Sequence, residues 1–248
     1  MNSLAYRAEL RARGDWTAYL MEESGLPGPR GNLELAHAVA QEDALRLESY
    51  LGAAFQDAPE NTPQVFLVFC GVLGLGVRLA RGESAALPRL RAFASDPRWR
   101  VREAVATALQ LWGDSDLAGL VAAMVEWSGG GYYEQRAAVA ALCEPRLLKD
   151  PQTPFAVNAL LDLLDRVTAG LEQPGDRRAD DFQALRKTLG YGWSVALAAS
   201  LIAGKPRLER WIASPNPDVR WVVRENFKKN RLLRLDPDWV RACLARLG

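Results

Sequence analysis

A six-residue phrase occurs twice in this chain of 248 residues, and it constrains the fold more than any other feature. Residues 98–103 read Arg-Trp-Arg-Val-Arg-Glu, and residues 220–225 read Arg-Trp-Val-Val-Arg-Glu. Trp99 and Glu103 are four residues apart, so on a helix they are neighbours on one side. A phrase that returns with the same spacing is typical of a repeat protein.

Helix signals occur along the chain, and no segment shows the sustained alternation of apolar and polar residues that a strand requires. Four Asp-Pro or Asn-Pro pairs predict helix starts, because the side chain caps open N–H groups and proline suits the first helical position. These pairs are Asp96-Pro97, Asp150-Pro151, Asn216-Pro217 and Asp236-Pro237. We therefore predict an all-α protein, an α-solenoid in which HEAT-like helical hairpins bury their faces against their neighbours.

We expect residues 1–248 to form a single superhelical domain, with N-terminal helices over 1–83 and the repeat region over 84–248. A polar insertion near residues 171–181 is the most linker-like segment. Residues 65–79 are the most apolar run, but they fall short of the roughly 18 uninterrupted apolar residues of a membrane span. We predict a buried core helix there and no association with membranes.

The histidine and cysteine content excludes several kinds of site. His37 is the only histidine, so no site can use two imidazole ligands, and any His-based triad would need this residue. The three cysteines are far apart and odd in number, which argues against a disulfide framework or a zinc site. We expect no metal and no cofactor, and a reducing, cytoplasmic setting.

Charge is distributed unevenly, although the formal net charge is only +1. Residues 1–88 carry 7 Arg or Lys against 11 Asp or Glu, whereas residues 220–248 carry 8 against 3. An anionic partner is therefore expected at the C-terminal half, where Lys228, Lys229 and Arg231 form a basic cluster. The same cluster also fits an ordinary solvated helix end, where cations interact favourably with the helix dipole.

Three short motifs occur in the order found in one family of helical-repeat proteins. Trp99 and Glu103 match that family's tryptophan and aspartate on one helix, with glutamate in place of aspartate. Residues 135–138, Gln-Arg-Ala-Ala, match an arginine phrase of its next repeat, and residues 187–191 resemble its later Lys-Ala-Ile-Gly-Trp phrase. Over residues 84–200 the chain thus resembles the HEAT-like alkylpurine DNA glycosylases of the AlkD type.

The resemblance implies a superhelix that binds nucleic acid through a basic concave face, and it raises metal-independent excision of alkylated purines as the activity. It makes Glu103 the catalytic candidate, because a carboxylate beside the sugar stabilises a developing oxocarbenium ion. It implies DNA contacts by Trp99, Arg136, Tyr191 and the nearby Trp193. The C-terminal basic cluster would add phosphate contacts that do not depend on sequence.

The same residues also have a purely structural interpretation. Trp99 fits a packing role, because indole brings a large apolar area to a core, and Glu103 fits a surface ion pair with a neighbouring arginine. The alternative function is therefore a non-enzymatic HEAT-repeat scaffold that binds another protein in the same groove. We expect a monomer in either case. Binding that weakens steeply with salt would distinguish DNA from a protein partner.

Overall fold

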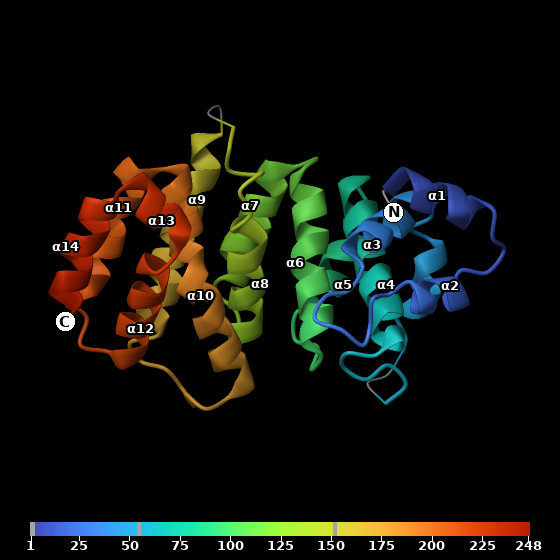
Figure 1. Ribbon diagram of the computed structural model, residues 1–248, viewed down its shortest axis with the longest axis horizontal. Coiled ribbons are helices and arrows are strands. Elements are labelled where there is room, and N and C mark those ends of the chain that lie inside the picture. The colour runs from blue at the N-terminus through green and yellow to red at the C-terminus, as the bar shows by residue number, and fades with distance from the viewer. Residues whose placement is uncertain (1–2, 54–55, 151–152) are drawn as a thin grey trace. The chain divides into compact units, whose positions relative to one another are not determined.

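The computed structural model describes residues 3–53, 56–150 and 153–248, and it shows an all-α protein (Figure 1). Over those residues it has 14 α-helices, two 3-10 helices and no strand, which confirms the predicted all-α class. The chain forms two compact units, residues 1–116 and residues 117–248. We call them the N-terminal and C-terminal units. Their boundary falls inside the predicted repeat region, and the single superhelical domain stays a prediction.

The N-terminal unit is built around one enclosed helix, α4 (Pro63–Ala80). Its length and composition alone would suit a membrane span, yet 72% of it is buried inside the protein, as a core helix should be. The other helices of this unit are α1 (Ser3–Arg11), α2 (Thr17–Glu22), α3 (Leu33–Glu42), the 3-10 helix Arg46–Tyr50, α5 (Ala86–Phe93) and α6 (Trp99–Gly113).

The backbones of α4 and α6 approach each other closely at two small residues. A Cβ atom added to Gly76 would lie 2.5 Å from the carbonyl oxygen of Ala108 and 2.6 Å from its Cα atom. No residue with a side chain fits this position without moving one of the helices. The contact therefore fixes the position of α6 on α4.

The start of α6 differs from the prediction, which had Asp96 as the cap and Pro97 as the first helical residue. The Asp96 carboxylate instead accepts the backbone N–H of Arg98 at 2.8 Å and pairs with the buried Arg98 guanidinium at 2.7 Å. Arg98 remains extended, and Trp99 is the first residue of the helix. The cap is lost because the buried cation takes the carboxylate.

The helices of the C-terminal unit pack in two alternating series. Consecutive even-numbered helices α8, α10, α12 and α14 contact one another, and so do α7, α9 and α11. Stacked helical hairpins produce this pattern. The bounds are α7 (Leu117–Trp127), α8 (Tyr132–Leu142), α9 (Pro154–Gly170), α10 (Asp180–Ala199), α11 (Leu201–Arg210), the 3-10 helix Trp211–Ala213, α12 (Pro217–Phe227), α13 (Asn230–Leu235) and α14 (Pro237–Leu247).

Two of the predicted helix starts in this unit are confirmed. The side chains of Asn216 and Asp236 accept backbone N–H groups from the first turns of α12 and α14. Of the remaining pair, Pro151 lies outside the described residues, and α9 begins at Pro154.

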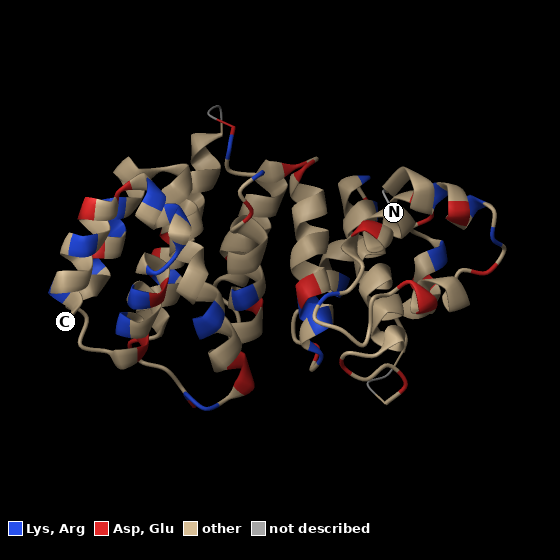
Figure 2. Ribbon diagram, in the orientation of Figure 1, with Lys and Arg blue, Asp and Glu red and all other residues tan. Residues whose placement is uncertain are grey.

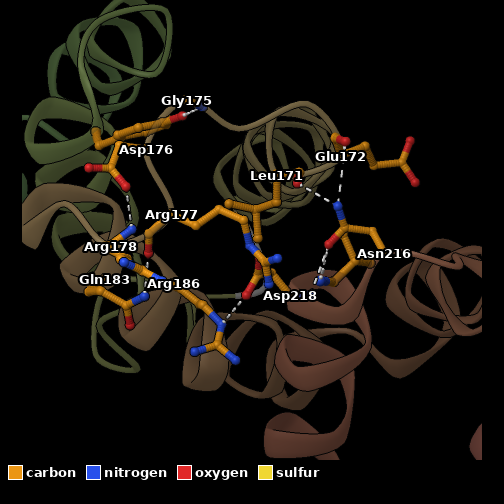
Figure 3. Close-up of polar contacts among 12 residues, drawn as sticks. Leu171, Glu172, Gly175, Asp176, Arg177, Arg178, Gln183, Arg186, Asn216 and Asp218 are labelled. Atoms are coloured by element: carbon orange, nitrogen blue, oxygen red, sulfur yellow. Dashed lines mark hydrogen bonds and ion pairs between the residues drawn. The ribbon is translucent and has the colours of Figure 1, made fainter.

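The polar insertion at residues 171–181 is anchored to the C-terminal unit by a buried carboxylate (Figure 3). Asp218 is 3% exposed, and its carboxylate forms ion pairs with Arg177 at 2.5 Å and with Arg186 at 2.9 Å. A buried carboxylate with two guanidinium partners is well compensated. The segment is therefore an ordered connection between α9 and α10, not a linker.

Replacing Gly76 with alanine should lower the free energy of unfolding by about 1–3 kcal/mol, because the new Cβ atom overpacks the α4–α6 contact. Gly52→Ala is the matched control in the same unit, since a Cβ atom there would meet nothing within 4 Å. The control should stay within about 0.5 kcal/mol of the wild type. Urea unfolding of the three proteins measures both effects, and equal stability of the two variants would contradict this packing.

The three cysteine thiols should be unreactive in the native protein. All three are free and buried. Burial raises the pKa of Cys243 to about 11 and the pKa values of Cys70 and Cys143 well above their usual range. Because only the thiolate reacts, Ellman's reagent in mildly alkaline buffer should label the chain slowly until urea unfolds it. Rapid labelling of the native protein would show that a thiol is accessible.

Candidate functional site

A cleft of about 310 Å³ opens in the N-terminal unit beside the first turn of α6. Its volume lies at the lower end of the roughly 300–1,000 Å³ range of small-molecule sites. The lining includes residues from the segment before α3, from the first turn of α3, from α4 and from α6, namely Arg30, Leu33, Phe66, Phe69, Trp99 and Glu103. The structure thus brings two predicted site residues, Trp99 and Glu103, into one cleft.

The cleft offers an aromatic surface and a carboxylate. Phe66 and Phe69 of α4 stack with ring centroids 6.2 Å apart and an interplanar angle of 9°. The Trp99 side chain is 39% exposed and Leu33 is 48% exposed, so both present apolar surface to solvent. Glu103 is also exposed, one helical turn beyond Trp99. Such a lining suits a flat ring that carries a positive charge or a polar substituent.

One wall of the cleft is the connection between α2 and α3, residues 23–32. Gly25 has φ +71°, and a Cβ atom on Gly28 would lie 2.4 Å from the Gly25 carbonyl oxygen. Only glycine satisfies both conditions without strain. The backbone N–H of Asn32 donates to the carbonyl of Ser24 at 2.8 Å and closes the connection on itself.

Arg100 ties this connection to α6. Its guanidinium donates to the carbonyl of Gly28 at 2.7 Å and to Oδ1 of Asn61 at 2.9 Å, and the residue is only 6% exposed. The same guanidinium lies over the Trp99 ring, 4.5 Å from its centroid. Arg100 therefore positions both the indole and the loop, with both hydrogen bonds made by Nη2, whereas its buried Nε has no hydrogen-bond partner among the described residues.

The second copy of the repeated phrase, which we call the closed copy, packs against a neighbouring helix, although Trp221 remains partly exposed. On α12, Trp221 packs against Gly190 of α10, where a Cβ atom would approach the ring to 3.0 Å. The Arg186 guanidinium covers the same ring at 4.0 Å from its centroid, and Glu225 pairs with Lys228 at 2.5 Å. The phrase is thus packed against a helix in the C-terminal unit and borders a cleft in the N-terminal unit. The open copy is the candidate site.

The other predicted site residues belong to the C-terminal unit. Arg136 on α8 and Tyr191 on α10 are half-buried. Trp193 is fully buried and donates its indole N–H to the Thr168 hydroxyl at 3.1 Å. It has no surface to offer DNA, so the structure corrects this prediction and assigns Trp193 to the core.

The basic cluster is only partly engaged in ion pairs. Lys228 pairs with Glu225, whereas Lys229 and Arg231 have no ion-pair partner among the residues that the structure describes. Arg231 and Lys149 border a second cleft of about 320 Å³ near the end of α10. Figure 2 shows further basic residues along α12, α13 and α14. This part of the C-terminal unit is suited to an anionic partner.

Comparisons with protein-family models, with curated proteins and with solved structures find no match for this chain. No group of three or more His, Cys, Asp or Glu residues able to hold a metal ion occurs within the described part of the chain. The geometry therefore carries the functional argument.

Several cleft residues could not be identified from the sequence. Arg30, Leu33, Phe66 and Phe69 are 30 or more positions from Trp99 and share no motif with it. The glycine- and proline-rich run at residues 25–29 indicates a chain reversal, but not the helix that it will meet. Only the packing of α6 on α4 joins these segments.

Arg100→Met should loosen residues 23–32 and raise the rate of tryptic cleavage after Arg30 by about tenfold, because hydrogen bonds to a charged group contribute about 1.5–3 kcal/mol. Arg89→Met is the control, since Arg89 pairs with Glu48 on the surface. Mass spectrometry of the fragments over time measures the rate. If the two variants are cleaved at the same rate, Arg100 does not hold the loop.

Proposed function

We propose that this chain is a HEAT-like α-solenoid that binds DNA and excises alkylated purines, with the cleft of the N-terminal unit as its base site. The observation that carries the proposal is that Trp99 and Glu103 line the same cleft. These two residues are also the pair on which the resemblance to HEAT-like alkylpurine glycosylases depends. The alternating packing of α7 to α14 supports the solenoid architecture.

The chemistry of an alkylated purine fits this lining. Such a base carries a positive charge and leaves as a neutral molecule, so its departure needs little acid catalysis. The exposed Trp99 indole favours a flat cation over a neutral base, and the largely buried Phe66 and Phe69 add apolar lining behind it. To reach the cleft, the nucleotide must leave the base stack, which costs a few kcal/mol and costs least for a damaged base.

Glu103 is the proposed catalytic residue. The bond between C1′ of the deoxyribose and the purine nitrogen breaks, and its electron pair leaves with the base. The positive charge that develops on the sugar is stabilised by the Glu103 carboxylate. A water oxygen then bonds to C1′ and loses a proton to the same carboxylate. The products are the free base and an abasic site.

The C-terminal unit supplies the proposed attraction to the DNA backbone. Residues 220–248 carry 8 basic against 3 acidic side chains, and Lys229 and Arg231 lie among those with no ion-pair partner in the described residues. Arg136 adds a guanidinium whose planar fork matches a phosphate. The free, buried cysteines fit the reducing cytoplasm, where we propose that the protein acts as a monomer.

The test is release of free base from methylated duplex DNA by the wild type, Glu103→Gln and Glu225→Gln. Glu103→Gln should lower the release rate by about 100-fold while retaining DNA binding, because it removes the charge that stabilises the transition state. Glu225→Gln alters the same position of the closed copy and should retain both activities. DNA binding should weaken steeply as salt rises.

If the wild type neither releases base nor binds DNA at low salt, the proposal fails. The alternative, a HEAT-repeat scaffold for a protein partner, would then take its place. If Glu103→Gln and Glu225→Gln release base equally fast, Glu103 is not the catalytic residue.

A further inference from the structure

We infer that Arg30 is a phosphate-binding residue, so that the cleft accepts a purine nucleotide as a whole and not the base alone. This inference rests on the proposed function for the identity of the base. Arg30 lines the cleft and is exposed, and its side chain has no hydrogen-bond or ion-pair partner among the described residues. The Arg30 guanidinium therefore lines the cleft without an ion pair to any described residue.

Several other arginines of the N-terminal unit are engaged within the protein, although the exposed Arg81, away from the cleft, has no side-chain partner among the described residues. Surface pairs join Arg7 and Arg11 to Glu42, and Arg78 and Arg89 to Glu48. The second arginine of the cleft, Arg100, is tied to the loop carbonyl and to Asn61. Arg100 is also only 6% exposed, so Arg30 is the exposed guanidinium of the two that line the cleft.

The backbone of Arg30 is held in place although its side chain has no partner. A Cβ atom on Gly25 would lie 3.1 Å from the carbonyl oxygen of Arg30, so the chain is folded closely on itself here. The N–H of Asn32 and the guanidinium of Arg100 hold the two flanks of the segment. A side chain presented on a fixed backbone loses less conformational freedom on binding.

The charge around the cleft argues for a specific contact. Residues 1–88 carry 11 acidic against 7 basic side chains, so the general field of this region repels phosphate. An unpaired arginine at the cleft is thus a local exception. Its planar fork can donate two parallel hydrogen bonds to phosphate oxygens.

The cleft then offers one group for each part of a purine nucleotide. Trp99 presents apolar surface to the base, with the largely buried phenyl rings of α4 in the lining behind it, and Glu103 presents a carboxylate to the sugar. Arg30 takes the phosphate. The volume of about 310 Å³ suits a ligand of this size, given the roughly 300 Å³ lower bound for small-molecule sites.

The test compares deoxyguanosine 5′-monophosphate with deoxyguanosine by calorimetry at low salt. The wild type should bind the monophosphate about tenfold more tightly, because a charged hydrogen-bonded pair supports a preference of that order. Arg30→Gln should abolish this preference. Arg81→Gln is the control, since Arg81 is an exposed arginine of the same unit that does not line the cleft. It should retain the preference.

If Arg30→Gln keeps the full preference for the monophosphate, or if the wild type has none, the inference is overturned. Thermal unfolding of each variant checks that the fold is intact, which an exposed side chain should not affect. A single-stranded trinucleotide distinguishes the source of the phosphate. Tighter binding of the trinucleotide supports Arg30 as a contact to the DNA backbone, and tighter binding of the monophosphate supports it as a contact to a free nucleotide.

This result can be separated from the fate of the proposed function. An Arg30-dependent preference for the monophosphate, without base release by the wild type, would support the phosphate site and overturn the glycosylase activity. Base release by the wild type, with a preference that Arg30→Gln leaves unchanged, would overturn the phosphate site alone.

Discussion

The contact between Gly76 and Ala108 is the interaction on which the N-terminal unit and its cleft depend. It lets the backbone of α6 lie directly against α4, the most enclosed helix of that unit. The two helices run in the same direction, so the first turns of α6 lie beside the part of α4 that carries Phe66 and Phe69. The cleft is the space left between these turns and the loop that Arg100 holds. If α4 and α6 were further apart, the cleft would be wider and its lining residues would no longer lie together.

A buried amide has a comparable role in the C-terminal unit. The Asn226 side chain of α12 is fully buried; it donates to the carbonyl oxygens of Leu189 and Val222, each at 2.8 Å, and accepts the backbone N–H of Ser194 at 2.8 Å. Two of these partners are on α10, so the amide joins the helices through satisfied backbone groups. Trp221 packs between the same pair of helices, against Gly190.

The two copies of the Arg-Trp-x-Val-Arg-Glu phrase therefore have different roles because their neighbours differ. Beside Trp221 the chain places Gly190, and the backbone of α10 packs directly against the ring. Beside Trp99 it places a loop rich in glycine and proline, which leaves a cavity with one carboxylate and one uncommitted arginine. An exposed aromatic ring with such neighbours is the usual mark of a ligand site. The proposed chemistry follows from that difference.

The all-α class and the starts of α12 and α14 follow from local sequence patterns, because caps, apolar stripes and proline starts act over a few residues. Helices α12 and α14 begin at the predicted Asn216-Pro217 and Asp236-Pro237 pairs, and the spacing of Trp99 and Glu103 already placed them on one side of a helix. Contacts between residues on different helices depend on the tertiary structure, because no local pattern encodes them. The Asp96 carboxylate pairs with the buried Arg98 and does not cap the helix. Trp193 lies in the core because other helices pack around α10, and periodicity alone could not distinguish this position from a surface one. The cleft itself joins segments about 70 positions apart, and only the packing of α6 on α4 brings them together.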